Sequence, residues 1–359
     1  MKLLLILALQ GCTDKGASEF DRSLMLATTV ESVILPSHEE LLTGAQTLVT
    51  HVNALCSAPD ALDLAAARDS WSQVSTELSR MQVWGFGPAR EDAIELTKNL
   101  DKWPANAEAI EAIVAGSDTL DAAYIAGLDY TERVVGYPAI EYLLWSDPTT
   151  DEIIARFENP RRCQLLIGLA EHAAGFVADY HAAWSPDAGD YASELSLAGQ
   201  GSSTFSSEQA AVTELVSGVL TATTFLSGMR LGVPLGDSNG GTALPDQVEA
   251  PFAVASLERI EATMAGIRAL YVVDGEHGLA DYVRSRQAAG DVDAAVTGAL
   301  DAADSAIGAI PGPLEHAVSS APEAVRAAIN AVDGVTVVFA GDVSTLLGVN
   351  PTAVEADND

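Results

Sequence analysis

The stretch Gly136-Tyr137-Pro138-Ala139-Ile140-Glu141-Tyr142-Leu143-Leu144-Trp145 places a single carboxylate, that of Glu141, among apolar residues. This composition predicts a buried helix, and a carboxylate inside a protein needs a partner. Pro138 lacks an N–H and favours a helix start, so it should begin or kink this helix and leave Glu141 in or near the first turn. Two roles for Glu141 stay open: pairing with an arginine such as Arg133 or Arg162, or contact with a ligand.

The chain as a whole is expected to be all-α. Apolar residues recur at spacings of three and four, for example at Val212, Leu215, Val219 and Leu226, and no strand pattern stands out. Proline and glycine stops, including Pro36, divide the first half into helices. We expect two tandem four-helix-bundle-like domains, with boundaries at 31–185 for the N-terminal bundle, 186–207 for a linker rich in Ser, Gly, Ala and Asp, 208–350 for the C-terminal bundle and 351–359 for an acidic tail.

The N-terminus predicts a secreted lipoprotein. Met1-Lys2 precedes the apolar run Leu3 to Leu9, and Leu9-Gln10-Gly11-Cys12 is similar to a bacterial lipobox. We therefore expect a signal peptide at 1–11, lipidation of Cys12 and a tether at 12–30. Thr13 after the cysteine favours the outer membrane. The expected location is the periplasm, with the lipid as the only contact to the membrane.

The net charge of the chain limits the choice of binding partners. The 359 residues include 18 Lys and Arg and 51 Asp and Glu, a formal net charge of −33, which argues against binding nucleic acid or an anionic lipid surface.

If Cys12 carries lipid, two cysteines are left in the chain, Cys56 and Cys163. In an oxidising compartment we expect them to form a disulfide that ties the first helix to a later helix of the same domain. The alternative is two unpaired buried cysteines.

Several segments together resemble the imelysin-like family of bacterial periplasmic proteins and lipoproteins. The stretch around Glu141 is similar to the family's G-x-H-x-x-E motif and the aromatic-leucine run that follows. Further matches occur in the family's order, at Trp71 with Phe86-Gly87-Pro88, at 229–236, at Val248-Glu249-Ala250-Pro251-Phe252 with Ser256-Leu257, and at Leu347-Gly348-Val349 with 357–359. The resemblance implies a helical fold and a role in iron uptake.

One departure from the family motif limits what the resemblance implies. Pro138 stands where the motif has histidine, and proline cannot coordinate a metal. Ser75, Ser79 and Gln82 stand where relatives with the full motif carry Arg and Glu, so we expect a pocket stripped of most of its ligands. Glu141 is then the one candidate ligand for a divalent metal or iron, and the cofactor stays unknown.

The resulting hypothesis is a non-enzymatic binding or accessory component of iron uptake, with an outer-membrane or periplasmic iron-transport component as its partner. Its site is expected in the cleft between the two bundles, formed by the motif and by residues brought to it, namely Gly136, Tyr137, Pro138, Glu141, Trp71, Phe86 and Arg230. One alternative is a residual metallopeptidase, since the family is named for a peptidase activity, although one carboxylate without a histidine argues against it. The other is a structural lipoprotein that docks a membrane receptor.

Overall fold

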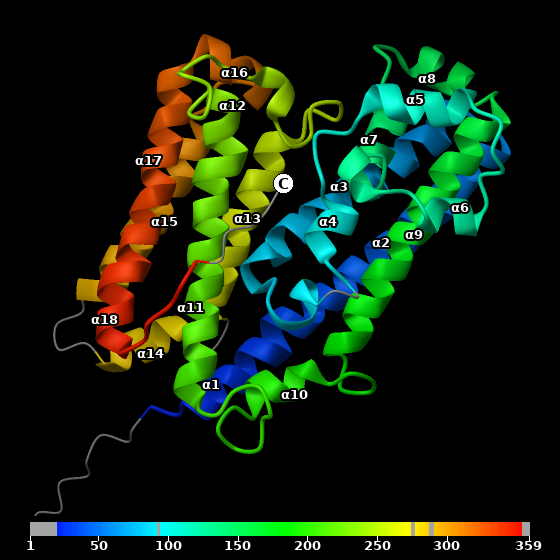
Figure 1. Ribbon diagram of the computed structural model, residues 1–359. Helices are drawn as coiled ribbons and strands as arrows, with labels where there is room; N and C mark the ends of the chain where they lie inside the picture. Colours follow the sequence, from blue (N-terminus) through cyan, green and yellow to red (C-terminus); the bar gives the residue numbers. More distant parts are fainter. Residues whose placement is uncertain (1–19, 92–93, 274–276, 287–290, 354–359) are drawn as a thin grey trace, which may run out of the picture.

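The computed structural model describes residues 20–91, 94–273, 277–286 and 291–353, and within these ranges all regular structure is helical, as predicted. Figure 1 shows two groups of helices side by side. The first group contains α1 (Arg22–Thr29), η1 (Val30–Ile34), α2 (Leu35–Ser57), α3 (Ala61–Met81), η2 (Gln82–Trp84), η3 (Gly87–Arg90), α4 (Leu96–Leu100), α5 (Ala107–Ala115), α6 (Ala122–Ala126), η4 (Tyr130–Glu132), α7 (Gly136–Trp145), α8 (Thr150–Arg156), α9 (Pro160–Trp184) and α10 (Tyr191–Ser196).

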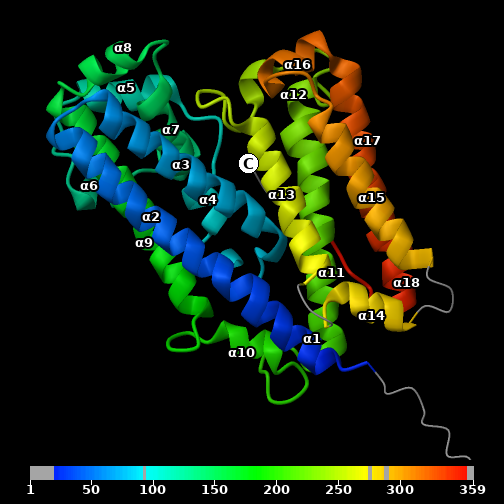
Figure 2. The same ribbon diagram turned by 180° about the vertical axis from the view of Figure 1, so that it is seen from behind.

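The second group is built around long helices that run along one another, with short helices at their ends (Figures 1 and 2). Its elements are α11 (Glu208–Phe225), η5 (Leu226–Gly232), α12 (Val233–Leu235), η6 (Pro245–Gln247), α13 (Ser256–Tyr271), α14 (Leu279–Arg286), α15 (Asp291–Gly308), α16 (Leu314–Ser320), α17 (Pro322–Val338), η7 (Phe339–Val343) and α18 (Ser344–Leu347). Two continuous stretches, Glu208–Leu235 and Pro322–Leu347, are long and apolar enough to span a membrane by length and composition, and the first is 72% buried inside the protein.

Two expectations about the beginning of the chain were wrong. Residues 22–29, assigned to the tether, form α1, because Asp21 caps its N-terminus and Met25 and Leu26 are buried. The cleavage site and Cys12 lie outside the described residues. Pro36 does not end a helix either: the π-turn of η1 precedes it, and helical structure continues from Arg22 to Ser57. A π-turn shifts the carbonyl that the proline ring would otherwise strike, so the helix passes through.

The disulfide between Cys56 and Cys163 is confirmed. It joins the last turn of α2 to the first turn of α9, and the two Cα atoms are 5.4 Å apart. Helices α2 and α9 pack along each other, which brings cysteines 107 residues apart in sequence into bonding distance.

The two groups meet where α3 and η2 pack against α13 and α11. A Cβ atom added at Gly218 in α11 would overlap the carbonyl oxygen of Val83, and one added at Gly266 in α13 would overlap that of Arg80. Glycine therefore lets both helices approach the backbone of the first group closely. The described hydrophobic core is continuous through this contact.

The segment 186–207, expected to be a linker, contains α10, whose Ala192 and Leu195 are buried. Helix α10 packs against α1 and α9 at the base of the molecule. The expected linker is thus part of the packed structure. One hydrophobic core runs through both groups of helices. The division of the chain into two separate domains stays a prediction.

Candidate functional site

The helix that carries the altered motif begins at a glycine for a steric reason. Gly136 has φ +72°, and a Cβ there would collide with the carbonyl oxygens of Leu100 and Asn99. Pro138 follows in the first turn of α7, where its missing N–H leaves no intrahelical bond unmade. The indole nitrogen Nε1 of Trp71 donates to the carbonyl oxygen of Tyr137 at 2.8 Å, which ties α3 to the start of α7.

The carboxylate of Glu141 binds backbone groups of the second group of helices. Its Oε1 accepts the N–H of Phe252 at 2.8 Å and that of Ala253 at 2.7 Å. The predicted arginine partners are therefore wrong for the described structure, and Arg162 pairs with Glu111 instead. Because Glu141 belongs to α7 and its donors belong to the loop 248–255, this contact joins the two groups of helices.

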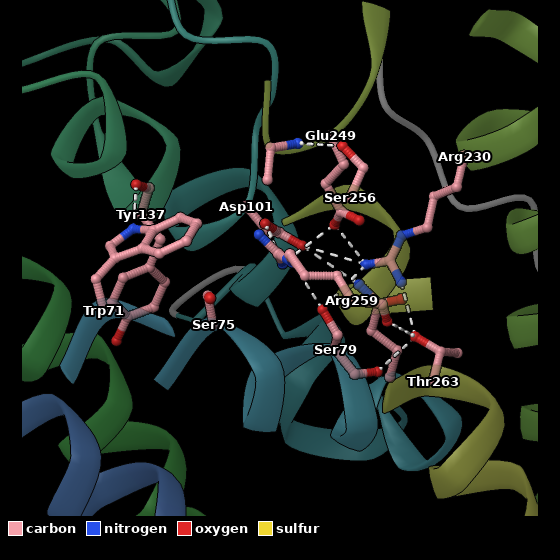
Figure 3. Close-up of polar contacts among 12 residues, drawn as sticks. Trp71, Ser75, Ser79, Asp101, Tyr137, Arg230, Glu249, Ser256, Arg259 and Thr263 are labelled. Atoms are coloured by element: carbon pink, nitrogen blue, oxygen red, sulfur yellow. Dashed lines mark hydrogen bonds and ion pairs between the residues drawn. The ribbon is translucent and has the colours of Figure 1, made fainter. Parts of the chain in front are cut away.

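A buried ionic network lies beside this contact. Figure 3 shows guanidinium groups from Arg230 in η5 and Arg259 in α13 facing carboxylates. Both contact Oε1 of Glu249, at 2.5 Å and 3.1 Å, and Arg259 also binds Oδ1 of Asp101 at 2.8 Å. Arg259 donates to Oγ of Ser79 at 2.9 Å. All five side chains are at most 2% exposed, so the network is buried.

Burial governs the protonation of these groups. Removal from water raises the pKa of Glu141 to about 8, although two backbone N–H groups oppose the shift. Burial also raises the pKa of Glu249 and lowers that of Arg230. The same cause, burial, therefore favours the protonated form of both Glu141 and Glu249.

The structure brings only some of the predicted site residues together. Trp71 is bonded to Tyr137, and Arg230 belongs to the network, while Phe86 packs against Trp184 in the core of the first group. These predicted cleft residues and Glu141 are at most 1% exposed. Their side chains are therefore packed and do not face solvent in a cleft between the two bundles. Their contact with a ligand stays a prediction.

The expectation of a stripped polar pocket is also wrong. Ser79 is bonded to both arginines, and the Nε2 of Gln82 donates to Asp101 at 3.3 Å. Sequence reasoning missed Asp101, Glu249 and Arg259. A signal existed for Glu249, since it stands among apolar residues in Val248 to Phe252 as Glu141 does in its own helix. Asp101 and Arg259 carry no such signal.

The motif does not fit a metal ion. Two N–H donors take Oε1 of Glu141, Pro138 offers no ligand atom, and the charged neighbour Arg259 would repel a cation. Across the described ranges no three His, Cys, Asp or Glu side chains gather as metal ligands. The assignment of Glu141 as a metal ligand is therefore not supported by the donors around it.

An interface cavity of about 310 Å³ lies next to the network. It opens between α3, α4 and α11, with Leu78, Leu96 and Phe225 among its apolar walls and Asp101 and Gln82 among its polar ones. None of the predicted site residues is among those that line this cavity.

Comparison with known proteins is consistent with the sequence resemblance. The chain is 25% identical over 253 residues to the iron-regulated protein A of Synechococcus elongatus, a match that covers 70% of this chain and 64% of that protein's length. A crystal structure of a putative iron-regulated protein A precursor from Parabacteroides distasonis superposes with TM-score 0.77 at 19% identity, covering 93% of this chain and 97% of that one.

An imelysin-like protein from Psychrobacter arcticum gives TM-score 0.73 at 16% identity, covering 93% of this chain and 99% of that one. Both structures share the fold. Residues 34–338, most of the chain, match the imelysin (peptidase M75) family. The chain therefore belongs to the imelysin family.

Proposed function

We propose that this protein is a non-enzymatic binding component of iron uptake. The observation that carries the proposal is a contact made by the altered motif. Glu141 accepts hydrogen bonds from two backbone N–H groups and so holds a loop of the second group of helices against the first. A carboxylate engaged in this way positions an interface. The iron-related role is supported by the family and by the relative named iron-regulated protein A.

A metallopeptidase is the weaker alternative. Peptide hydrolysis at a metal needs about three protein ligands and an open coordination position. The motif contributes one carboxyl group, and its Oε1 already accepts two hydrogen bonds. The residues present therefore do not support a metal-dependent step.

The proposed location is the periplasmic side of the outer membrane. It rests on the apolar run Leu3 to Leu9 and the lipobox-like segment ending in Cys12. A lipid anchor there would hold the protein near an outer-membrane or periplasmic iron-transport component, the proposed partner. The other alternative is a structural lipoprotein that docks a membrane receptor. In that case a partner protein should co-purify with it, and it should bind no small ligand.

The test is radioactive iron uptake by iron-limited cells that lack the gene. Wild-type protein should restore uptake, and Arg259→Lys, which keeps the charge but loses the planar fork, should restore little of it. Arg268→Lys is the matched control, since Arg268 lies on the same helix and pairs with Asp301 and Asp304 at the surface. Equal uptake with and without the gene would show that the protein has no part in iron acquisition.

A further inference from the structure

The two arginines of the network have more donors than their present partners use. Arg230 and Arg259 both point at Oε1 of Glu249. Within the described part of the chain, Nε of Arg230 and Nη1 of Arg259 have no hydrogen-bond partner. Arg230 and Arg259 are each 1% exposed, and buried polar groups in proteins are normally hydrogen-bonded.

Unused guanidinium donors of this kind are expected where a carboxylate fits its site incompletely. Guanidinium groups bind carboxylates best through two parallel N–H to oxygen bonds, one to each oxygen. Glu249 offers a single oxygen to both arginines. A free carboxylate is not attached to a backbone and can turn both oxygens toward the unused donors.

The loop that carries Glu249 is strained and partly outside the core. Val254 has φ +58°, a left-handed conformation that a β-branched residue rarely adopts. Its side chain is 53% exposed, and neighbouring Phe252 and Ala253 are half-buried. The hydrogen bonds from Phe252 and Ala253 to Glu141 hold this end of the loop down. Lifting the loop would break these bonds and relieve the strain at Val254.

We propose that the Arg230–Arg259 pair is a binding site for a small carboxylate ligand, and that Glu249 occupies it as an internal substitute until the loop 248–255 lifts. This names the ligand class for the binding role proposed above and rests on that role. Asp101 stays in place and holds the guanidinium of Arg259, so the site keeps its orientation when Glu249 leaves.

The probe is citrate, titrated into the purified protein by calorimetry at about 0.15 M salt, where charges more than about 8 Å apart are largely screened. Glu249→Gln keeps the shape of the loop and weakens its hold on the arginines. The variant should bind citrate on the order of tenfold more tightly than the wild type, since a charge-assisted hydrogen bond of the competitor is lost. Sulfate, which lacks carboxylate geometry, should bind more weakly to both proteins.

Glu111→Gln is the matched control. Glu111 also contacts two arginines, Arg156 and Arg162, but belongs to α5 in the first group, and its replacement should leave citrate binding unchanged. Equal affinity of wild type and Glu249→Gln, or no heat with either folded protein, would overturn the proposal.

Hydrogen exchange of the wild type decides the matter if Glu249→Gln does not fold. Citrate should then speed exchange of the Phe252 and Ala253 amides, which are bonded to Glu141 in the closed loop. Unchanged exchange at saturating citrate would refute the lifting of the loop. The iron-uptake assay is independent of these results, so the ligand class can fail while the role in uptake stands.

Discussion

Glu141 gives the sharpest prediction, because its buried carboxyl group should make the stability of the protein depend on pH. The folded protein keeps a proton on Glu141 up to a pKa of about 8, whereas the value for an exposed glutamate is 4.5. Between these two pH values the folded state binds more protons than the unfolded chain. The free energy of unfolding must therefore fall as the pH rises through this window.

The magnitude follows from the same two values. Each pH unit over which one proton separates the two states changes the free energy of unfolding by about 1.4 kcal/mol, so the span from 4.5 to about 8 sets an upper value of about 5 kcal/mol. Glu141→Gln cannot ionise, yet its amide oxygen can still accept the N–H groups of Phe252 and Ala253. The variant should match the wild type near pH 4.5 and exceed it by several kcal/mol at pH 8.5.

Urea denaturation of both proteins at pH 5, 6, 7, 8 and 8.5 measures this difference. Glu171→Gln, an exposed change on α9, is the control and should shift stability little at any pH. A difference between wild type and Glu141→Gln that is the same at pH 5 and pH 8.5 would refute the buried, protonated carboxyl group.

Three further predictions concern the backbone and the cross-link. Gly218→Ala should cost about 1–3 kcal/mol of stability, because its Cβ would overlap the carbonyl oxygen of Val83. Gly298→Ala, on the open face of α15, is the control and should gain about 0.4–1 kcal/mol. Thermal melting of the two variants compares these effects directly. Replacing Cys56 by serine should cost about 5 kcal/mol, the loop-closure value for a separation of 107 residues, and a reductant should lower the melting temperature of the wild type alone. Val254→Gly should stabilise the protein by roughly 0.5–1 kcal/mol, since relief of about 1–2 kcal/mol of left-handed strain exceeds the added chain entropy; a loss of stability in urea titration would contradict the strain.

The sequence predicted those features that depend on local pattern. The helical spacing of apolar residues and the capping residues define helices such as α9, which starts at Pro160 after the cap Asn159. The cysteine count predicted the disulfide correctly, because two cysteines remained for one bond. Pro36 was misjudged because the π-turn that accommodates it leaves no residue signature in the sequence.

The partners of Glu141 could not be predicted from residue types. Its donors are backbone N–H groups 111 and 112 residues away, and every residue except proline has such a group. Asp101 was missed for a related reason: it follows the short helix α4 in an irregular segment without periodicity, and only the fold places it against Arg259. The sequence pointed to a buried carboxyl group at Glu141, but the long-range partners of Glu141 and of Asp101 were not predictable from it.

These contacts give a physical reason for a motif that keeps glutamate without histidine. A metal site would need further ligands beside Glu141, whereas a clamp needs one oxygen aimed at two backbone donors. Glu141 meets the second requirement, and Pro138 in the first turn of α7 costs this arrangement nothing. If the carboxyl group serves as a clamp, its hydrogen-bonding oxygen matters more than its charge. Glutamine should then replace it in every property except the pH dependence, while leucine should release the loop 248–255 and the carboxylate of Glu249 with it.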